Sequence, residues 1–190
     1  MSSTLSEPID EAYVAQLRGE FPRLRIIDKA DDGLSKLIDV ALKAITFGGQ
    51  SAFMTRYVTT IRRTIYLPEG WRSRTPESRY ITLRHEAVHL RQFRRYGLIG
   101  TALIYLIPIL PMGLAWGRAR LEWEAYAETL RATAEVHGID AARSPTLHEY
   151  IRKQFTGPAY GWMWPFDRAV QGWINQVVSD FEVETRAAAH

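Results

Sequence analysis

The sequence predicts an α+β fold that is mostly helical, with a small β-sheet preceding a long helix. Over much of the chain, apolar residues recur at intervals of three and four, which is the helical pattern. Residues 57–67 are instead dense in β-branched and aromatic residues and end at Pro68-Glu69-Gly70, which is typical of a strand and its turn. A chain of 190 residues can bury a substantial core, so we predict a single domain over residues 9–190.

The composition excludes some classes of site and of partner. The chain has no cysteine, which excludes a disulfide scaffold and a cysteine-ligated zinc site. Its net charge of +3 is small and its basic residues are interspersed with acidic ones, so we expect no nucleic-acid partner. Residues 1–8 are polar and do not resemble a signal peptide, so we expect a flexible tail and a cytoplasmic protein.

The first half of the chain contains two predicted helices and one predicted strand. The helices cover residues 9–17 and 31–48, and the second of them ends at Gly48-Gly49. The strand over residues 57–67 needs a partner, for which residues 24–27 and 52–54 are the candidates. We interpret it as an ordinary sheet strand; if it were an edge strand, it could bind an extended peptide.

A third helix is predicted from Thr75-Pro76, where threonine caps the helix and proline occupies its first position, to Gly97. Residues 98–117 then contain no charge, but Pro108, Pro111 and Gly113 leave too short an unbroken limb to cross a bilayer. We interpret this stretch as a buried helix and turn. The alternative is a re-entrant or interfacial patch, which would give the protein a peripheral membrane contact.

Three further helices complete the predicted fold. The first begins between residues 116 and 119 and ends at His137-Gly138, where glycine is a common stop. The others cover residues 147–155 and 165–181. The aromatic cluster at residues 160–166 is most typical of a core or of a wall against the uncharged stretch.

Within the third helix, His85-Glu86-Ala87-Val88-His89 has the pattern H-E-x-x-H. Histidines at positions i and i+4 lie on one face of a helix, where both can bind one metal ion. Zinc is the expected ion, because it binds imidazole nitrogen and catalytic sites use three protein ligands. Glu86 is rotated by about 100° from His85 and would take a proton from the attacking water.

A third ligand is expected from the helix that begins near Trp116. Glu124 and Glu128 lie four residues apart on this helix, where like charges repel unless something compensates them. Zinc bound by Glu124, with Glu128 accepting the ring N–H of a ligand histidine, would do so. Glu122 is the rival ligand, but Arg118 lies four residues before it and could pair with it. We therefore favour Glu124.

The combination of H-E-x-x-H with a later E-x-x-x-E helix resembles the gluzincin metallopeptidases, whose second motif is E-x-x-x-[D/E]. The resemblance implies a zincin-like fold with His85, His89 and Glu124 as zinc ligands, Glu86 as the general base and Glu128 as the acid that orients a histidine. It also implies a peptide or protein substrate, bound along an upstream strand. A Tyr or His stabilises the oxyanion in this family, and the candidates here are His137, His148, Tyr150 and Tyr160.

Two other functions remain open on the sequence. One is a non-catalytic peripheral membrane or protein-binding module with a structural or vestigial metal site. The other is a metal-dependent hydrolase that acts on something other than peptides. Glu86 separates catalysis from a structural site, because a purely structural zinc site does not need a general base.

Overall fold

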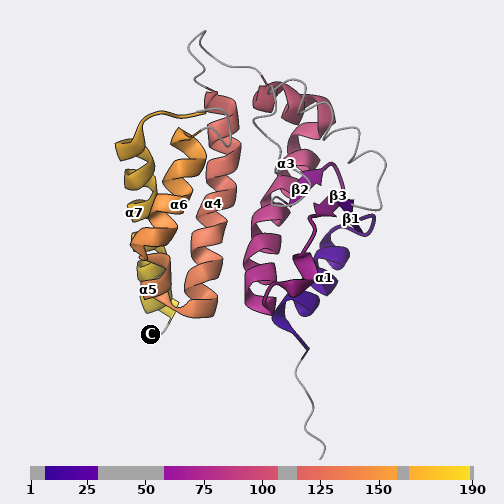
Figure 1. Cartoon of the computed structure of the whole chain (residues 1–190), viewed down its shortest axis with the longest axis horizontal. Helices are drawn as coiled ribbons and strands as arrows, with labels where there is room; N and C mark the ends of the chain where they lie inside the picture. The colour runs from indigo at the N-terminus through magenta and orange to yellow at the C-terminus, as the bar shows by residue number, and fades with distance from the viewer. Residues whose placement is uncertain (1–6, 30–57, 107–114, 158–162, 189–190) are drawn as a thin grey trace, which may run out of the picture. The chain divides into compact units, whose positions relative to one another are not determined.

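The computed structural model describes residues 7–29, 58–106, 115–157 and 163–188 (Figure 1). The chain divides into two compact units, Met1–Leu90 and Arg91–His190, which we call the N-terminal and C-terminal units. The fold is mostly helical with one small sheet, which confirms the predicted α+β class. The single domain over residues 9–190 stays a prediction, and the expected helix over residues 31–48 lies outside the described residues.

In its described residues, the N-terminal unit combines two helices with a three-stranded sheet. These elements are α1 (Ile9–Glu20), β1 (Arg25–Asp28), β2 (Thr59–Ile61), β3 (Thr64–Leu67), the 3-10 turn η2 (Trp71–Ser73) and the first part of α3 (Pro76–Leu106). The strand order is β1-β3-β2, with β1 parallel and β2 antiparallel to β3. Ile65 in the central strand is fully buried and pairs with Ile26 and Thr60.

The single strand predicted over residues 57–67 is wrong, because the structure forms a hairpin there. Arg62 adopts a φ of 56° between β2 and β3, and this left-handed conformation reverses the chain. The predicted partner at residues 24–27 is confirmed by β1, whereas residues 52–54 lie outside the described part. Within the described strands β3 is central, so β1 and β2 are the edges.

Helix α1 is tied to α3 by a largely buried ion pair. The Nε of Arg79 donates to Oδ2 of Asp10 at 2.6 Å, and Nη2 donates to Oδ1 at 3.2 Å. This two-pronged hydrogen bond raises the pKa of Arg79 above its ordinary value, since Asp10 stabilises the charged guanidinium. Tyr13 and Leu17 of α1 join Leu83 of α3 in the same apolar core. The pair and this core together hold α1 on α3.

Helix α3 begins where the sequence predicts and bends where the sequence predicts an end. The Ser78 backbone N–H donates to Thr75 Oγ1 at 3.2 Å, so Thr75 caps the helix that starts at Pro76. Gly97 has φ 69° and ψ 177°, which breaks the helical path. The helix resumes and runs to Leu106. Residues 76–96 therefore form one regular segment that carries His85 and His89.

The C-terminal unit contains the last part of α3 and four further helices, α4 (Trp116–His137), α5 (Ile139–Ala142), α6 (Pro145–Thr156) and α7 (Asp167–Ala188). Helices α4, α6 and α7 confirm three predicted helices, whereas the short α5 was not predicted. Gly138, with φ 85°, ends α4 as expected. Phe155, Met163 and Ile174 are fully buried in the core of this unit.

We call the part of α3 after Gly97, residues 98–106, its second limb. Its side chains are less buried than the sequence predicts. Ile99 is 76% exposed and Leu103 is 52% exposed, so the prediction of a buried helix is wrong for these side chains. The turn predicted near residues 108–113 lies outside the described residues. Among the helices that the structure describes, none is long and apolar enough to cross a membrane.

Gly117 permits a close crossing of α4 and the second limb of α3. A Cβ added at Gly117 would lie 2.4 Å from the carbonyl oxygen of Ile104, which is backbone and cannot rotate away. We expect Gly117→Ala to lower the free energy of unfolding by about 1–3 kcal/mol, because overpacking outweighs the helix propensity of alanine. Gly172→Ala in α7 is the control, since a Cβ there meets nothing within 4 Å.

The control should stabilise the chain by about 0.5–1 kcal/mol, which is the usual difference between alanine and glycine in an exposed helix. Urea unfolding of both variants measures the two effects with opposite signs. Equal stabilisation by both substitutions would contradict the close crossing.

Candidate metal site

The regular segment of α3 places His85 and His89 on one helical face. Their ring centroids are 5.1 Å apart and the ring planes are inclined at 72°. Both side chains are half-buried, so the pair is shielded on one side and still accessible. Two imidazole nitrogens at this spacing can bind one metal ion, as the i, i+4 pattern predicts.

Glu86 is rotated by about 100° from His85 around the helix axis and is buried, with 5% of its surface exposed. The hydroxyl of Thr60, in β2, donates a hydrogen bond of 2.7 Å to Oε2 of Glu86. Thr60 is itself buried, so this bond lies away from bulk water, where it is strong. The sheet therefore holds the carboxylate of Glu86, the residue that follows His85, in one orientation.

The H-E-x-x-H pattern predicts Glu86 to be a general base, and Thr60 would then position it. Thr60→Val keeps the shape of the side chain and removes the hydroxyl, so we expect activity to fall by about 10–100-fold, as for other residues that orient a catalytic group. Zinc content should not change, because Thr60 offers no ligand atom to the metal group. Thr60→Ser keeps the hydroxyl and should restore most of the activity. Full activity in Thr60→Val, assayed on a peptide that the wild type cleaves, would contradict this role.

In the C-terminal unit, two glutamates of α4 have different surroundings. Glu122 is buried, with 3% of its surface exposed, and its Oε1 accepts a hydrogen bond of 3.2 Å from the hydroxyl of Tyr105. Glu124 is more exposed and forms an ion pair of 3.2 Å with Arg120 on the same helix. Its Oε2 also accepts a hydrogen bond of 3.0 Å from Nε2 of Gln92. The repulsion expected between Glu124 and Glu128 is thus offset in part by Arg120.

Gln92 lies in the part of α3 that belongs to the C-terminal unit, and its side chain is bonded to α4. Besides Glu124, the buried Nε2 of Gln92 donates to the backbone oxygen of Leu121 at 2.9 Å. These two bonds fasten α3 at Gln92 to the turn of α4 that begins at Leu121.

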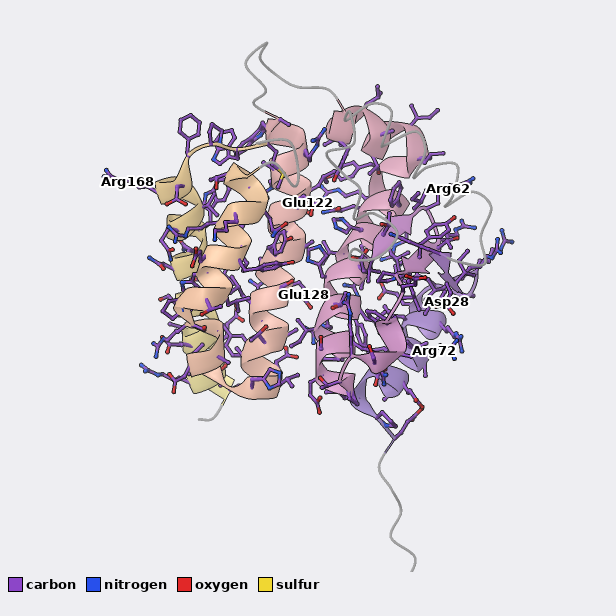
Figure 2. The ribbon with its side chains drawn as sticks, viewed as in Figure 1. Asp28, Arg62, Arg72, Glu122, Glu128 and Arg168 are labelled. Carbon is purple, nitrogen blue, oxygen red and sulfur yellow. The ribbon has the colours of Figure 1, made fainter. Side chains whose placement is uncertain are left out.

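His85 and His89 belong to the N-terminal unit, and the buried carboxylate of Glu122 belongs to the C-terminal unit. Two imidazoles and one carboxylate are a donor set that suits zinc with one position left open. Glu124, which we favoured on sequence grounds, is less buried than Glu122. Glu128 is half-buried on α4 (Figure 2), and its role in orienting a histidine stays a prediction.

The candidate oxyanion residues are only partly placed. Both ring nitrogens of His148 have hydrogen-bond partners: Nε2 lies 2.8 Å from the carbonyl oxygen of Ala142, and Nδ1 lies 3.2 Å from Nε2 of Gln171. His137 is exposed at the end of α4, and Tyr150 is 50% exposed on α6. Tyr160 lies outside the described residues. The choice among His137, His148, Tyr150 and Tyr160 stays a prediction.

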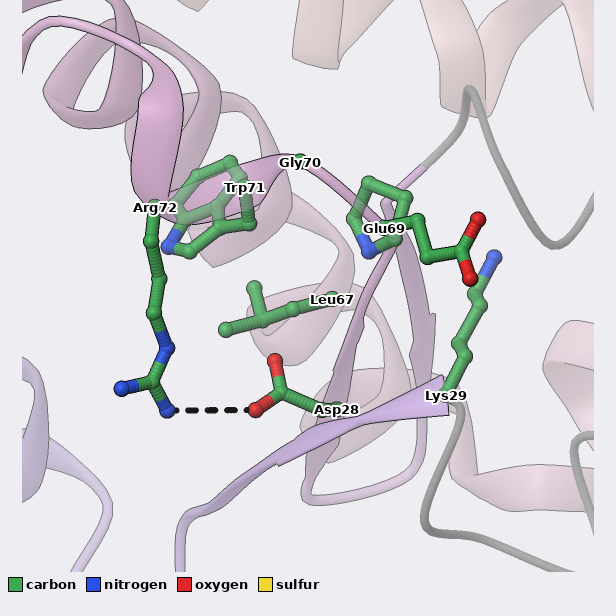
Figure 3. A pocket seen from close by; sticks show the side chains of 8 residues that line it. Asp28, Lys29, Leu67, Glu69, Gly70, Trp71 and Arg72 are labelled. Carbon is green, nitrogen blue, oxygen red and sulfur yellow. Dashed lines mark hydrogen bonds and ion pairs between the residues drawn. The ribbon is translucent and has the colours of Figure 1, made fainter.

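A separate cavity of about 260 Å³ lies where β1 and β3 end in the N-terminal unit (Figure 3). Its lining includes Asp28, Lys29 and Arg72, but none of the histidines and not Glu86. Asp28 accepts a hydrogen bond of 3.2 Å from Arg72, and buried Lys29 donates to the hydroxyl of Thr59 at 3.0 Å. The charged groups of the cavity are thus bonded to residues of the same unit. Because no candidate zinc ligand lines it, the cavity is distinct from the candidate metal site.

Sequence reasoning missed Thr60, Gln92 and Tyr105, which support the candidate site. Each has its partner at least 17 residues away along the chain, so no local pattern indicates the contact. Comparison of the chain with protein-family models, with curated proteins and with solved structures found no match, so the resemblance to gluzincins rests on the motif residues alone.

Proposed function

We propose that this protein is a zinc-dependent metallopeptidase. The observation that carries the proposal is the placement of Glu86, a buried carboxylate that Thr60 holds one residue from His85 on the regular segment of α3. A structural zinc site needs ligands but no general base. A carboxylate positioned next to two potential ligands is what metal-dependent hydrolysis requires.

The proposed zinc ligands are His85, His89 and Glu122. We prefer Glu122 to Glu124 because Glu122 is buried and its carboxylate is oriented within the C-terminal unit, whereas Glu124 is engaged by Arg120 and Gln92. The hydroxyl of Tyr105 would orient the carboxylate of Glu122, as polar neighbours commonly do for metal ligands. Glu124 stays the alternative that the gluzincin motif favours.

Zinc bound in this group would act as a Lewis acid that polarises the scissile carbonyl and acidifies water. Glu86 would take the proton of the attacking water and pass it to the leaving amine, so that the peptide C–N bond breaks and a carboxylate and an amine are formed. The hydrogen bond from Thr60 keeps the Glu86 carboxylate directed during both proton transfers.

A peptide substrate is favoured by the edge strand β2. Among the described strands β2 is an edge, and its Thr60 contacts Glu86 directly. An extended peptide that paired with an edge strand would therefore lie close to the general base. This arrangement favours peptide bonds over other hydrolysable groups, and it selects unstructured segments over folded domains.

The test is metal analysis of the purified chain together with cleavage of a peptide library followed by mass spectrometry. We expect about one zinc per chain and cleavage that a chelator stops and added zinc restores. His89→Ala should lose both zinc and cleavage. Stoichiometric zinc without cleavage of any peptide would instead support the non-catalytic module, and the absence of zinc binding would contradict both.

A further inference from the structure

Exposed apolar side chains gather at one end of the C-terminal unit. We call this set the apolar end: Leu98, Ile99, Leu103, Trp116 and Phe166, which are 45%, 76%, 52%, 41% and 52% exposed. They come from the second limb of α3, the first turn of α4 and the residue before α7. Large exposed apolar groups are unremarkable singly, but a contiguous set indicates a binding surface.

Contacts within the unit show that these three segments are neighbours. The first turn of α4 touches the limb of α3 at Gly117, where the carbonyl oxygen of Ile104 approaches closely. The ring of Trp116 lies 5.0 Å from the ring of Trp164, which in turn lies 5.0 Å from the ring of Phe166. The first turn of α4 therefore lies beside both the limb of α3 and the start of α7, the three segments that carry the apolar end.

Basic residues border the apolar end. Arg94 and Arg95 are exposed just before Gly97, and Arg168 is exposed in the first turn of α7 (Figure 2). The exposed acid nearest to Phe166 in sequence is Asp167, which forms an ion pair of 2.8 Å with Arg152. The surface thus combines apolar side chains with a positively charged border.

We propose that the apolar end docks the protein on an anionic lipid surface as a peripheral contact. Leucine and isoleucine would enter the boundary of the acyl chains, Trp116 would lie at headgroup level, and the arginines would contact lipid phosphates. The limb over residues 98–106 is about 14 Å long, whereas the hydrocarbon core is about 30 Å thick, so it can lie in the interface but cannot cross it.

Lipid explains the charge pattern better than a protein partner does. Residues 98–117 contain no charge, and the exposed Arg94 and Arg95 come shortly before them. A protein partner would have to offer acidic groups opposite each arginine, whereas an anionic bilayer presents negative charge over its whole surface and apolar chains beneath it. This inference does not depend on the proposed peptidase activity.

The test is co-sedimentation of the full chain with vesicles of phosphatidylcholine alone and with about one third phosphatidylglycerol. We expect binding to the anionic vesicles that weakens as salt is raised. Ile99→Glu should weaken binding by about tenfold, because it removes an inserted apolar group and adds a repelled charge. Arg94→Gln and Arg95→Gln should each weaken it by about fivefold.

Val183→Glu is the matched control, because Val183 is 64% exposed near the far end of α7 from Phe166. It should bind as the wild type does, and circular dichroism should show that all variants are folded. The proposal is overturned if the wild type does not bind anionic vesicles, or if Val183→Glu weakens binding as much as Ile99→Glu. It is also overturned if Ile99→Glu instead abolishes self-association measured without lipid, which would identify a second copy as the occupant.

Discussion

Glu86→Gln should reduce peptide hydrolysis by about 10²–10⁴-fold while the protein keeps its zinc. The amide has the shape of the carboxylate and can still bond with the Thr60 hydroxyl, so the fold should tolerate the change. It cannot accept a proton, however, and the attacking water then has no base. The measurement is kcat/KM on a peptide that the wild type cleaves, with zinc content determined on the same sample.

Glu77→Gln is the matched control, because Glu77 lies in the first turn of the same helix and away from the histidine pair. It should leave kcat/KM within about twofold of the wild type, as is usual for a surface change that touches no substrate. Unchanged turnover in Glu86→Gln would show that Glu86 is not the base and would contradict the proposed mechanism. A loss of zinc in Glu86→Gln would mean instead that Glu86 takes part in metal binding.

Glu122→Gln should weaken zinc binding by at least about 100-fold, because even residues that only orient a ligand change the affinity by about 10–100-fold. The glutamine can still accept the Tyr105 hydroxyl, so this buried position should remain hydrogen-bonded. Glu124→Gln should keep its zinc, since Glu124 is paired with Arg120 and contacted by Gln92. Competition with a calibrated zinc chelator measures both affinities.

The opposite result, zinc lost in Glu124→Gln and kept in Glu122→Gln, would restore the ligand set that the gluzincin motif implies. The two assignments differ in more than one residue. With Glu122 as ligand, the position four residues later is Tyr126, a buried ring 5.7 Å from Phe155, in place of the Asp or Glu of the motif. The protein would then share the H-E-x-x-H turn with gluzincins and depart from them in the second helix.

The local features of the protein were determined by the sequence itself. The spacing of His85 and His89 places them on one face of any helix, and the Thr75-Pro76 cap makes that helix begin before them. Gly138 ends α4 because glycine adopts its positive φ without strain. Each of these features depends only on residues within one or two helical turns, so it can be predicted without the fold.

Contacts between distant segments were decided only by the tertiary structure. No pattern in the sequence indicates that Thr60 would meet Glu86 or that Arg62 would divide the predicted strand. Glu122 and Glu124 are two positions apart and point to different sides of α4, so the packing of that helix decides which carboxylate is buried. The exposure of Ile99 likewise follows from what packs on the second limb of α3, because hydrophobicity measures a preference for burial and not the presence of a neighbour.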